Sequence, residues 1–455
     1  MKRVWLVLPD QLSIRVFCDT GIVDGLRARL PERLAAVFLV PREAAAQWTG
    51  RLDGLPVLHG EELTAPGRGL RERAARRLDA ALDRQLGYFP LAIRLNERHG
   101  FHLERMRPGH PNWMLDSARA GALPRWRALE RAMARWHFSP RRHVPGRLAR
   151  ALAGECAALV VSNVQPASVV PFLAGARRLR LPVVAYVASW DHTVGKGVIS
   201  PHCARYLVQN EAMREDLARY HGIGPERVVV TGWPQSDVFH RRRPRAAYEE
   251  LLRRHGLDPA RPLVLFLGNT PTNAPYEGRL VERLLAWWEE GPRQRFQLLF
   301  RPHPRDREWR ERFGAAAGRE DAAVQAPSFT DLEELAALLQ HADAVVCNAG
   351  TVLLDALVND RPAVCVLYDE GGPPGESWAA KNVVGEHYRA LAASGAFYRA
   401  ERFEEVAAGI ERALARPEEL REERRRVVRE VVGEVDGRAA ERAVEAIVAA
   451  LPALP

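Results

Sequence analysis

Short apolar runs recur along the chain, and each is followed by Gly, Pro or Asn and then by a stretch of helical composition. The runs are continuous rather than alternating, which is typical of strands buried on both faces of a parallel sheet. We expect strands at 4–8, 35–40, 159–162, 183–187, 206–208 and 228–230, and then at 263–267, 297–300, 344–347 and 363–367. Helices are expected between strands, for example at 167–180, 211–220, 277–290 and 331–341. Strand and helix alternating in this order predict an α/β protein with doubly wound parallel sheets.

The alternation is interrupted once, where Gly232-Trp233-Pro234 and Asp258-Pro259 flank a single helix. This predicts two Rossmann-like domains, at 1–240 and 258–430, joined by a linker and helix at 241–257. The last segment, 431–455, is helical by composition and is expected to pack back on the first domain. Ligands of such sheets bind at the carboxyl ends of the strands.

Length and composition exclude several classes of protein. A chain of 455 residues that is 47% hydrophobic and 27% charged has room for a large core, and it resembles neither a disordered protein nor a disulfide-stabilised mini-protein. No run approaches the roughly 18 apolar residues that span a bilayer. The five cysteines include no Cys-x-x-Cys pair, which argues against a disulfide framework or a zinc site and favours the cytoplasm.

The positive charge is concentrated in one segment. Residues 91–150 hold 13 arginines and four acids, a net charge of +9 that equals the +9 of the whole chain. Three tryptophans, Trp113, Trp126 and Trp136, lie among these arginines. The segment is predicted to be a basic helical insertion. It is either a solvated insertion anchored by aromatic side chains or a surface for an anionic partner, such as the inner face of a membrane. No nucleic-acid partner is expected.

The strand expected at 344–347 runs into Asn348-Ala349-Gly350-Thr351, where a helix begins. The N–H groups and the positive dipole end of a helix N-terminus bind phosphate well. Gly350 allows close approach, and the Thr351 hydroxyl can cap the helix or donate to a ligand. Asp355, one turn further, could accept from sugar hydroxyls. The alternative is an ordinary helix cap with a solvated Asp355.

Two further polar groups follow second-half strands. Arg301 and His303 stand after the strand expected at 297–300, and flanking prolines keep the histidine backbone extended. The turn Gly268-Asn269-Thr270 closes the strand expected at 263–267 and could add N–H donors. A structural histidine is the alternative to a functional one.

The first half carries its own cluster at the end of the strand expected at 183–187. Asp191, His192, Thr193 and Lys196 combine a carboxylate, an imidazole, a hydroxyl and one of only three lysines. A lysine kept in a chain that uses arginine almost everywhere suggests a role that a guanidinium cannot fill. A capped turn would explain the same residues without function.

Together these blocks resemble the CDP-glycerol glycerophosphotransferases of teichoic acid synthesis over about 185–365. Four sets of residues match the spacing of that family's motifs: Trp190, Thr193 and Lys196; Gly232, Pro234 and Asp237; Arg301, His303 and Pro304; and Asn348 through Asp355. In this chain His192 stands one place after the family's histidine, and Gly350 with Thr351 replaces its serine pair. The resemblance implies the GT-B fold, with two Rossmann-like domains facing a central cleft, the first on the acceptor side and the second holding the donor nucleotide.

The implied function is that of a transferase. It would move a glycosyl or polyol-phosphate group from a nucleotide-diphosphate donor to an envelope or surface polysaccharide acceptor, for example a lipid-linked acceptor met peripherally at the membrane. Asp191 or His192 would be the general base, and His303 would act with Arg301 on the leaving phosphate. Donor contacts are predicted for Thr193, Lys196, Gly268, Asn269, Thr270, Arg301, Asn348, Gly350, Thr351 and Asp355. No Asp-x-Asp motif stands at a strand end, so neither metal nor other cofactor is expected.

Three alternatives stay open. The first is a CDP-glycerol-type glycerophosphotransferase, which keeps the fold and changes the transferred group. The second is a UDP-sugar 2-epimerase-like enzyme, although the His-Arg-Arg-Glu-Asn block expected of one is absent. The third is a non-catalytic protein that binds polyanions through residues 91–150.

Overall fold

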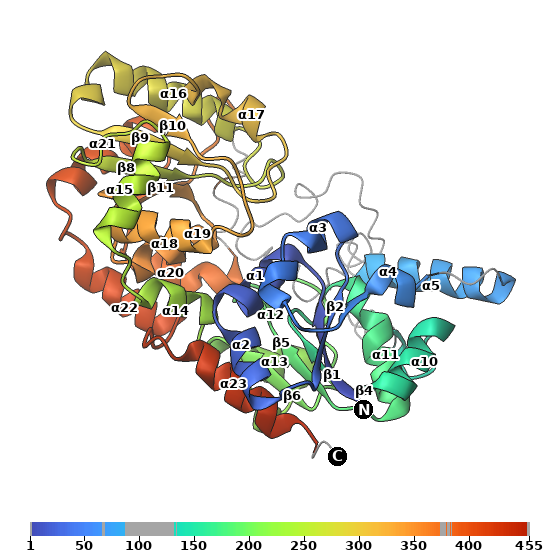
Figure 1. Ribbon diagram of the computed structural model, residues 1–455. Helices are drawn as coiled ribbons and strands as arrows, with labels where there is room; N and C mark the ends of the chain where they lie inside the picture. Colours follow the sequence, from blue (N-terminus) through green and yellow to red (C-terminus); the bar gives the residue numbers. More distant parts are fainter. Residues whose placement is uncertain are drawn as a thin grey trace. The chain divides into compact units, whose positions relative to one another are not determined.

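A computed structural model describes residues 2–65, 69–86, 132, 134–373, 379, 383 and 385–452. The described residues form two compact units. Unit 1 runs to Gln235 and resumes at Arg438, and unit 2 comprises Ser236–Gly437. The division falls inside helix α14 (Pro234–His240). Each unit is built on its own parallel sheet (Figure 1).

The sheet of unit 1 has seven strands in the order β3-β2-β1-β4-β5-β6-β7, and every neighbouring pair is parallel. The strands are β1 (Arg3–Leu8), β2 (Leu34–Phe38), β3 (Val57–His59), β4 (Cys156–Val161), β5 (Val183–Tyr186), β6 (Arg205–Val208) and β7 (Val228–Val230). The order reverses between β1 and β4, so the topological switch point of unit 1 lies at the carboxyl ends of these two strands.

Helices cover both faces of this sheet, with α1 (Gln11–Asp19), α2 (Ile22–Arg29) and the C-terminal α23 (Ala439–Ala450) on one side and α10 (Gly146–Glu155) and α11 (Val170–Leu179) on the other (Figure 1). The packing is tight at two glycines. A Cβ on Gly25 would lie 2.8 Å from Val444 Cγ2, and one on Gly175 would lie 2.5 Å from Leu152 Cδ1. The C-terminal helix α23 therefore packs closely on α2, within unit 1.

The sheet of unit 2 has six parallel strands in the order β10-β9-β8-β11-β12-β13. They are β8 (Leu263–Leu267), β9 (Gln297–Arg301), β10 (Ala322–Val324), β11 (Ala344–Asn348), β12 (Ala363–Val366) and β13 (Tyr398–Ala400). Numbered along the chain this is the Rossmann order 3-2-1-4-5-6, and its switch point lies between β8 and β11.

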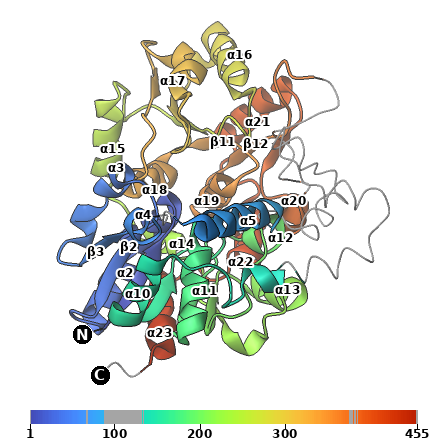
Figure 2. The same ribbon diagram turned by 90° about the vertical axis from the view of Figure 1, so that its right-hand side faces the viewer.

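The core of unit 2 lies between its sheet and two helices, α16 (Glu277–Glu290) and α21 (Phe403–Ala415). Aromatic rings from strands and loops interlock there: Phe266 lies 5.5 Å from Phe300 and 6.1 Å from Phe313, between ring centroids. The opposite face carries α15 (Arg245–Arg254), α18 (Leu332–His341) and α19 (Thr351–Val358) (Figure 1). Short α17 (Trp309–Arg312) lies beside α16, as Figures 1 and 2 both show.

The predicted doubly wound α/β architecture is confirmed, and all ten expected strands are present. Three strands were missed, namely β3, β10 and β13. Each has three residues and lies at an edge of its sheet, where one flank is open and a continuous apolar run is not required.

Three further expectations concern the cysteines, membrane-spanning helices and the basic segment 91–150. All five cysteines are free thiols. Among the described helices none is long and apolar enough to cross a membrane. Residues 91–131 and 133, most of the predicted basic insertion, lie outside the described residues.

Candidate functional site

The switch point of unit 2 brings together two turns that the sequence singled out. Gly268-Asn269-Thr270 follows β8, and Ala349-Gly350 follows β11 and leads into α19. A Cβ on Gly350 would lie 3.7 Å from Asn269 Nδ2, so the Asn269 amide stands against the start of α19. The carboxyl edge of the sheet therefore presents an amide donor and a helix N-terminus at one place.

The start of α19 has the features of an anion site. Gly350 occupies the N-cap position with an extended backbone and no capping side chain, and Thr351 is exposed. The Tyr388 hydroxyl donates to the Gly350 carbonyl at 2.7 Å, which holds the turn in place. Asn348 is 4% exposed, and its Oδ1 has no hydrogen-bond partner among the described residues. Because a buried polar atom left unpaired is costly, this amide is suited to a ligand or an ordered water.

The turn after β8 corrects one expectation. Its backbone N–H groups were predicted as phosphate donors, but all three are already used. Gly268 N donates to Arg301 O at 2.9 Å, Asn269 N donates to both carboxylate oxygens of Glu277 at 3.0 Å, and Thr270 N donates to Asn269 Oδ1 at 2.8 Å. Of the polar groups in this turn, only the side chains of Asn269 and Thr270 are then left to contact a nucleotide donor.

Gly268 has a packing role instead. A Cβ there would lie 2.7 Å from Phe313 Cζ, 3.2 Å from Glu277 Oε2 and 3.2 Å from Pro302 Cα. The glycine therefore allows the turns after β8 and β9 to approach each other above a buried carboxylate.

At the end of β9, the structure also corrects the role expected of Arg301. Its guanidinium is 6% exposed, forms an ion pair with Asp331 at 2.7 Å, and donates to Gln325 Oε1. The group predicted to neutralise the leaving diphosphate is thus already neutralised by a carboxylate from the start of α18.

His303 is partly exposed, and its Nδ1 accepts from Arg305 N at 3.0 Å. An accepting Nδ1 requires the proton of the neutral ring to be on Nε2, which makes Nε2–H a hydrogen-bond donor. Asp355 lies deeper, at 2% exposure. Its carboxylate is therefore buried in this structure and does not reach the surface, where it was predicted to contact sugar hydroxyls.

A buried ionic cluster below these turns was not recognised in the sequence. Arg312, at the end of α17, donates to Asn269 O at 2.9 Å, Ala274 O at 2.8 Å and Glu277 Oε2 at 2.8 Å, and also to Asp306. Burial raises the pKa of the Glu277 carboxyl, whereas the Arg312 guanidinium and the Asn269 N–H that donate to it lower that pKa. No motif signals these residues, since one arginine among many looks like surface composition.

In unit 1 the switch point carries a polar cluster that was also missed. Asp10 caps α1 by accepting from Leu12 N and Ser13 N, and its other oxygen accepts from Asn163 Nδ2 at 2.9 Å. Ser162 Oγ donates to Ser13 Oγ at 3.0 Å. Carboxylate, amide and hydroxyl groups therefore gather at the carboxyl ends of β1 and β4.

The predicted base loop follows β5. Asp191 accepts from Ser189 Oγ, and its other carboxylate oxygen lies 3.5 Å from Lys196 Nζ. The backbone carbonyl of His192 accepts from Gln165 Nε2 at 2.8 Å, which ties the loop to the turn after β4. Asp191, His192 and Lys196 are all partly exposed. The structure thus places the Asp191 carboxylate beside Lys196 Nζ, with His192 next to Asp191 in the chain.

Thr193 does not belong to that exposed group, which corrects its predicted role in donor binding. Its side chain is fully buried, and its hydroxyl donates to Asp216 Oδ2 at 2.7 Å. His221 holds the same segment: Ile199 N donates to its Nδ1 at 3.1 Å, and its Nε2 lies 2.8 Å from Thr193 O. Burial lowers the pKa of His221 to about 4, so the ring is neutral and Thr193 serves the loop's structure.

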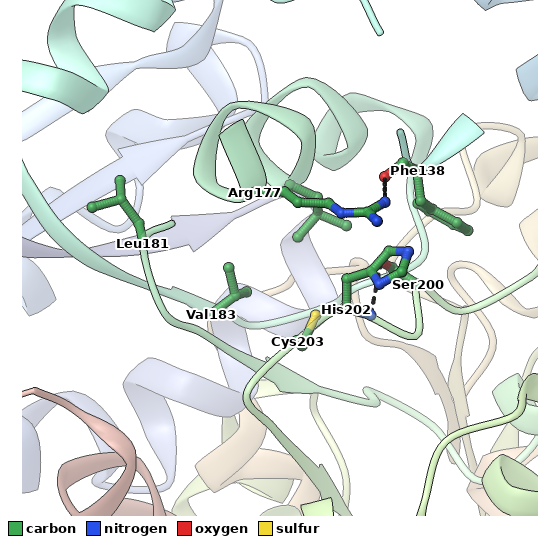
Figure 3. A pocket seen from close by; sticks show the side chains of 8 residues that line it. Phe138, Arg177, Leu181, Val183, Ser200, His202 and Cys203 are labelled. Carbon is green, nitrogen blue, oxygen red and sulfur yellow. Dashed lines mark hydrogen bonds between the residues drawn. The ribbon is translucent and has the colours of Figure 1, made fainter. Parts of the chain in front are cut away.

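A small pocket in unit 1 lies at the wrong end of the strands for this chemistry (Figure 3). Its lining includes Val183 at the start of β5 and His202 and Cys203 just before β6. Arg177, which also lines it, donates to Phe138 O at 2.7 Å. The pocket is thus at the amino ends of these strands, opposite the edge where α/β sheets bind ligands.

No group of three or more His, Cys, Asp and Glu side chains within the described ranges could hold a metal ion.

Two solved structures that are similar to this chain are UDP-GlcNAc 2-epimerases. The UDP-GlcNAc 2-epimerase from Methanocaldococcus jannaschii has a TM-score of 0.54 at 13% identity, covering 99% of this chain and 100% of that one. The epimerase from Neisseria meningitidis bound to UDP-GlcNAc has a TM-score of 0.56 at 11% identity, with the same coverage. At this identity the likeness shows the fold alone, and the fold is GT-B, as the resemblance in the sequence implied.

Sequence comparison identifies the family. No curated protein matches the chain. Residues 199–449, more than half of the chain, match the family model of CDP-glycerol:poly(glycerophosphate) glycerophosphotransferase, and the match includes the strand ends of unit 2 described above. The chain therefore belongs to the CDP-glycerol:poly(glycerophosphate) glycerophosphotransferase family and is a nucleotide-donor transferase that acts on cell-wall polymers.

Proposed function

We propose that this member of the family transfers a polyol phosphate from a CDP-linked donor to a hydroxyl of the growing polymer. The acceptor oxygen attacks the phosphorus that carries the polyol, the bond from that phosphorus to CMP breaks, and the hydroxyl proton passes to a base. The products are a phosphodiester and CMP. The observation that carries the proposal is the helix N-terminus at Gly350 and Thr351 beside the buried amide of Asn348 and the partly buried amide of Asn269.

In this proposal the switch point of unit 2 holds the donor diphosphate. The α19 amides and dipole attract the phosphate oxygens, and Asn269 Nδ2 donates from the neighbouring turn. His303 Nε2–H donates to the oxygen on which charge develops as CMP leaves. Arg301 does not bind phosphate directly but keeps the end of β9 in place through Asp331.

The base is proposed to come from the loop after β5. Asp191 already accepts from Ser189, and Lys196 lies 3.5 Å from its other oxygen, so the carboxylate is oriented. A general base must lie within hydrogen-bond distance of the proton that it accepts, and neighbours that fix its orientation help to keep it there. His192, the next residue in the chain, is the alternative general base in this proposal.

The reaction is further proposed to need no divalent metal. The negative charge of the donor diphosphate would be stabilised by the helix N-terminus and by neutral N–H groups rather than by a carboxylate-bound cation. Activity measured after exhaustive chelation with EDTA tests this. Retained activity supports the proposal, and loss that is restored by added Mg²⁺ contradicts it.

Peripheral membrane contact through the 91–150 segment is also proposed, because its 13 arginines suit an anionic leaflet and a lipid-linked acceptor. Co-sedimentation with anionic and neutral vesicles at low and high salt tests it. Binding to anionic vesicles alone, released by about 0.5 M salt, is the expected outcome.

The leaving group distinguishes polyol-phosphate transfer from the glycosyl transfer that also fits the fold. A glycosyltransferase breaks the bond from sugar carbon to oxygen and releases the nucleoside diphosphate. The purified protein is incubated with CDP-glycerol, or separately with UDP-GlcNAc, and a poly(glycerol phosphate) acceptor. Acceptor-dependent release of CMP supports the proposal. Release of UDP with extension of the acceptor would replace it by glycosyl transfer.

A further inference from the structure

Arg312 lies behind the donor turns, and one side chain there connects three segments of unit 2. Its two terminal nitrogens donate to Asn269 O and Ala274 O in the segment after β8, to Asp306 in the segment after β9, and to Glu277 in α16. The residue is 9% exposed, and the side chains of Glu277 and Asp306 are fully buried. None of these groups reaches the surface where a donor would lie.

The two partner carboxylates extend the connection to the backbone of both turns. Glu277 accepts from Asn269 N with both oxygens, at 3.0 Å. Asp306 accepts from Glu308 N at 2.9 Å, while Asp306 N donates to His303 O at 2.8 Å. Arg312 therefore determines where the backbones of both Asn269 and His303 can be.

Stability alone does not explain such a cluster. Buried ion pairs cost much of what they gain, and apolar residues of similar size often serve a core as well or better. A planar guanidinium does what an apolar side chain cannot, because its fork fixes several acceptors in one geometry. Here the acceptors belong to the two turns that present the amide and the imidazole.

We propose that Arg312 is a positioning residue of the donor site, which holds the turns after β8 and β9 together so that Asn269 and His303 meet the donor phosphates in one arrangement. The inference rests on the proposed function for the role of these two side chains. It adds a residue outside every motif that the sequence singled out. Arg312 touches no reacting atom and acts only through the turns.

The first test needs no ligand. Hydrogen exchange is measured by mass spectrometry on the full-length protein and on Arg312→Lys, which keeps the charge but loses the fork. Exchange should accelerate in the segments 268–274 and 302–306 and stay unchanged in the strands of unit 1. Arg310→Lys is the matched control, since Arg310 lies on the same helix but is exposed over the Trp309 ring. Unchanged exchange in both turns would overturn the proposal.

The second test measures the consequence for the donor. CDP binding is followed by calorimetry and turnover with CDP-glycerol by CMP release. Arg312→Lys should raise the Kd for CDP about tenfold and lower kcat/KM by up to about 100-fold, the scale of a 1 Å misplacement. Arg312→Met should lose more CDP affinity and more activity than Arg312→Lys. Arg310→Lys should have the same Kd and kcat/KM as the unmodified protein. Normal binding and turnover in a folded Arg312→Met variant would overturn the proposal.

Outcomes for the two proposals are separable. If the unmodified protein binds no CDP, the proposed donor fails, and the hydrogen exchange alone decides whether Arg312 holds the turns. If Arg312→Lys does not fold, Asp306→Asn removes one charge from the same cluster, and accelerated exchange confined to 302–306 is then expected. A folded Asp306→Asn with normal exchange there would count against the cluster's role.

Discussion

The guanidinium of Arg301 lies 2.7 Å from the carboxylate of Asp331, and the Arg301 side chain is 6% exposed. The pair joins the end of β9 to the start of α18, because Asp331 occupies the N-cap position of that helix. Arg301, although it belongs to a family motif, therefore stabilises the fold of its own unit. This changes what its mutation should do.

Removing one partner of this pair should destabilise the protein more than it weakens donor binding. Asp331→Asn leaves a buried guanidinium without its counter-charge, at a cost on the order of 3–5 kcal/mol. Urea denaturation should show this loss, whereas Asp321→Asn, at a more exposed ion-paired site, should cost about 1 kcal/mol or less. Equal losses in the two variants would mean that the Arg301 pair is not buried in solution.

Charge at Asn348 should decide donor affinity. Asn348→Asp puts a carboxylate beside the helix N-terminus that is proposed to hold phosphate, so like charges would repel each other there. We expect the Kd for CDP to rise at least about tenfold, or ~1.4 kcal/mol. Asn273→Asp, on the neighbouring turn, is the matched control and should change Kd less. Calorimetry at constant ionic strength measures both variants, and a tight Asn348→Asp complex would contradict the assignment.

The loop after β5 should affect chemistry rather than donor binding. Asp191→Asn and His192→Ala should each lower turnover, by roughly 10²–10⁴-fold for the residue that is the base, while the Kd for CDP stays within a few-fold. Thr193→Val, by contrast, should reduce stability, since it removes the hydrogen bond from the buried Thr193 hydroxyl to Asp216. Two fully active loop variants would remove this loop from the mechanism.

Stability should fall in mild acid partly through His221. Burial lowers the pKa of His221 from 6.5 to about 4, so between these values the unfolded chain binds a proton that the folded protein excludes. Folding stability therefore decreases as pH falls from about 6.5 to 4, by at most ~1.4 kcal/mol per pH unit from this one group. His221→Gln cannot titrate, and its denaturation free energy should depend less steeply on pH over this range. Parallel curves for the two proteins would show that His221 is protonated when folded.

The interior of each sheet could be predicted from the chain alone. β8 is apolar at every position and β11 at every position before Asn348, because both faces of these strands are buried, so their sequence pattern reflects their environment. Edge strands such as β13, with an exposed arginine at its centre, carry no comparable pattern. Their pairing depends on a neighbour that is distant in sequence.

The same division holds for the site. That Gly268–Thr270 and Gly350–Thr351 share one edge follows from the sequence, because the carboxyl ends of parallel strands lie together. Which groups remain available there was decided by tertiary contacts. Asp331 neutralises Arg301, Glu277 accepts from the backbone N–H of Asn269, and Arg312 is buried beneath both turns. A local pattern determines which polar groups arrive at a strand end, but their partners come from segments far along the chain, and only folding brings those within hydrogen-bond distance.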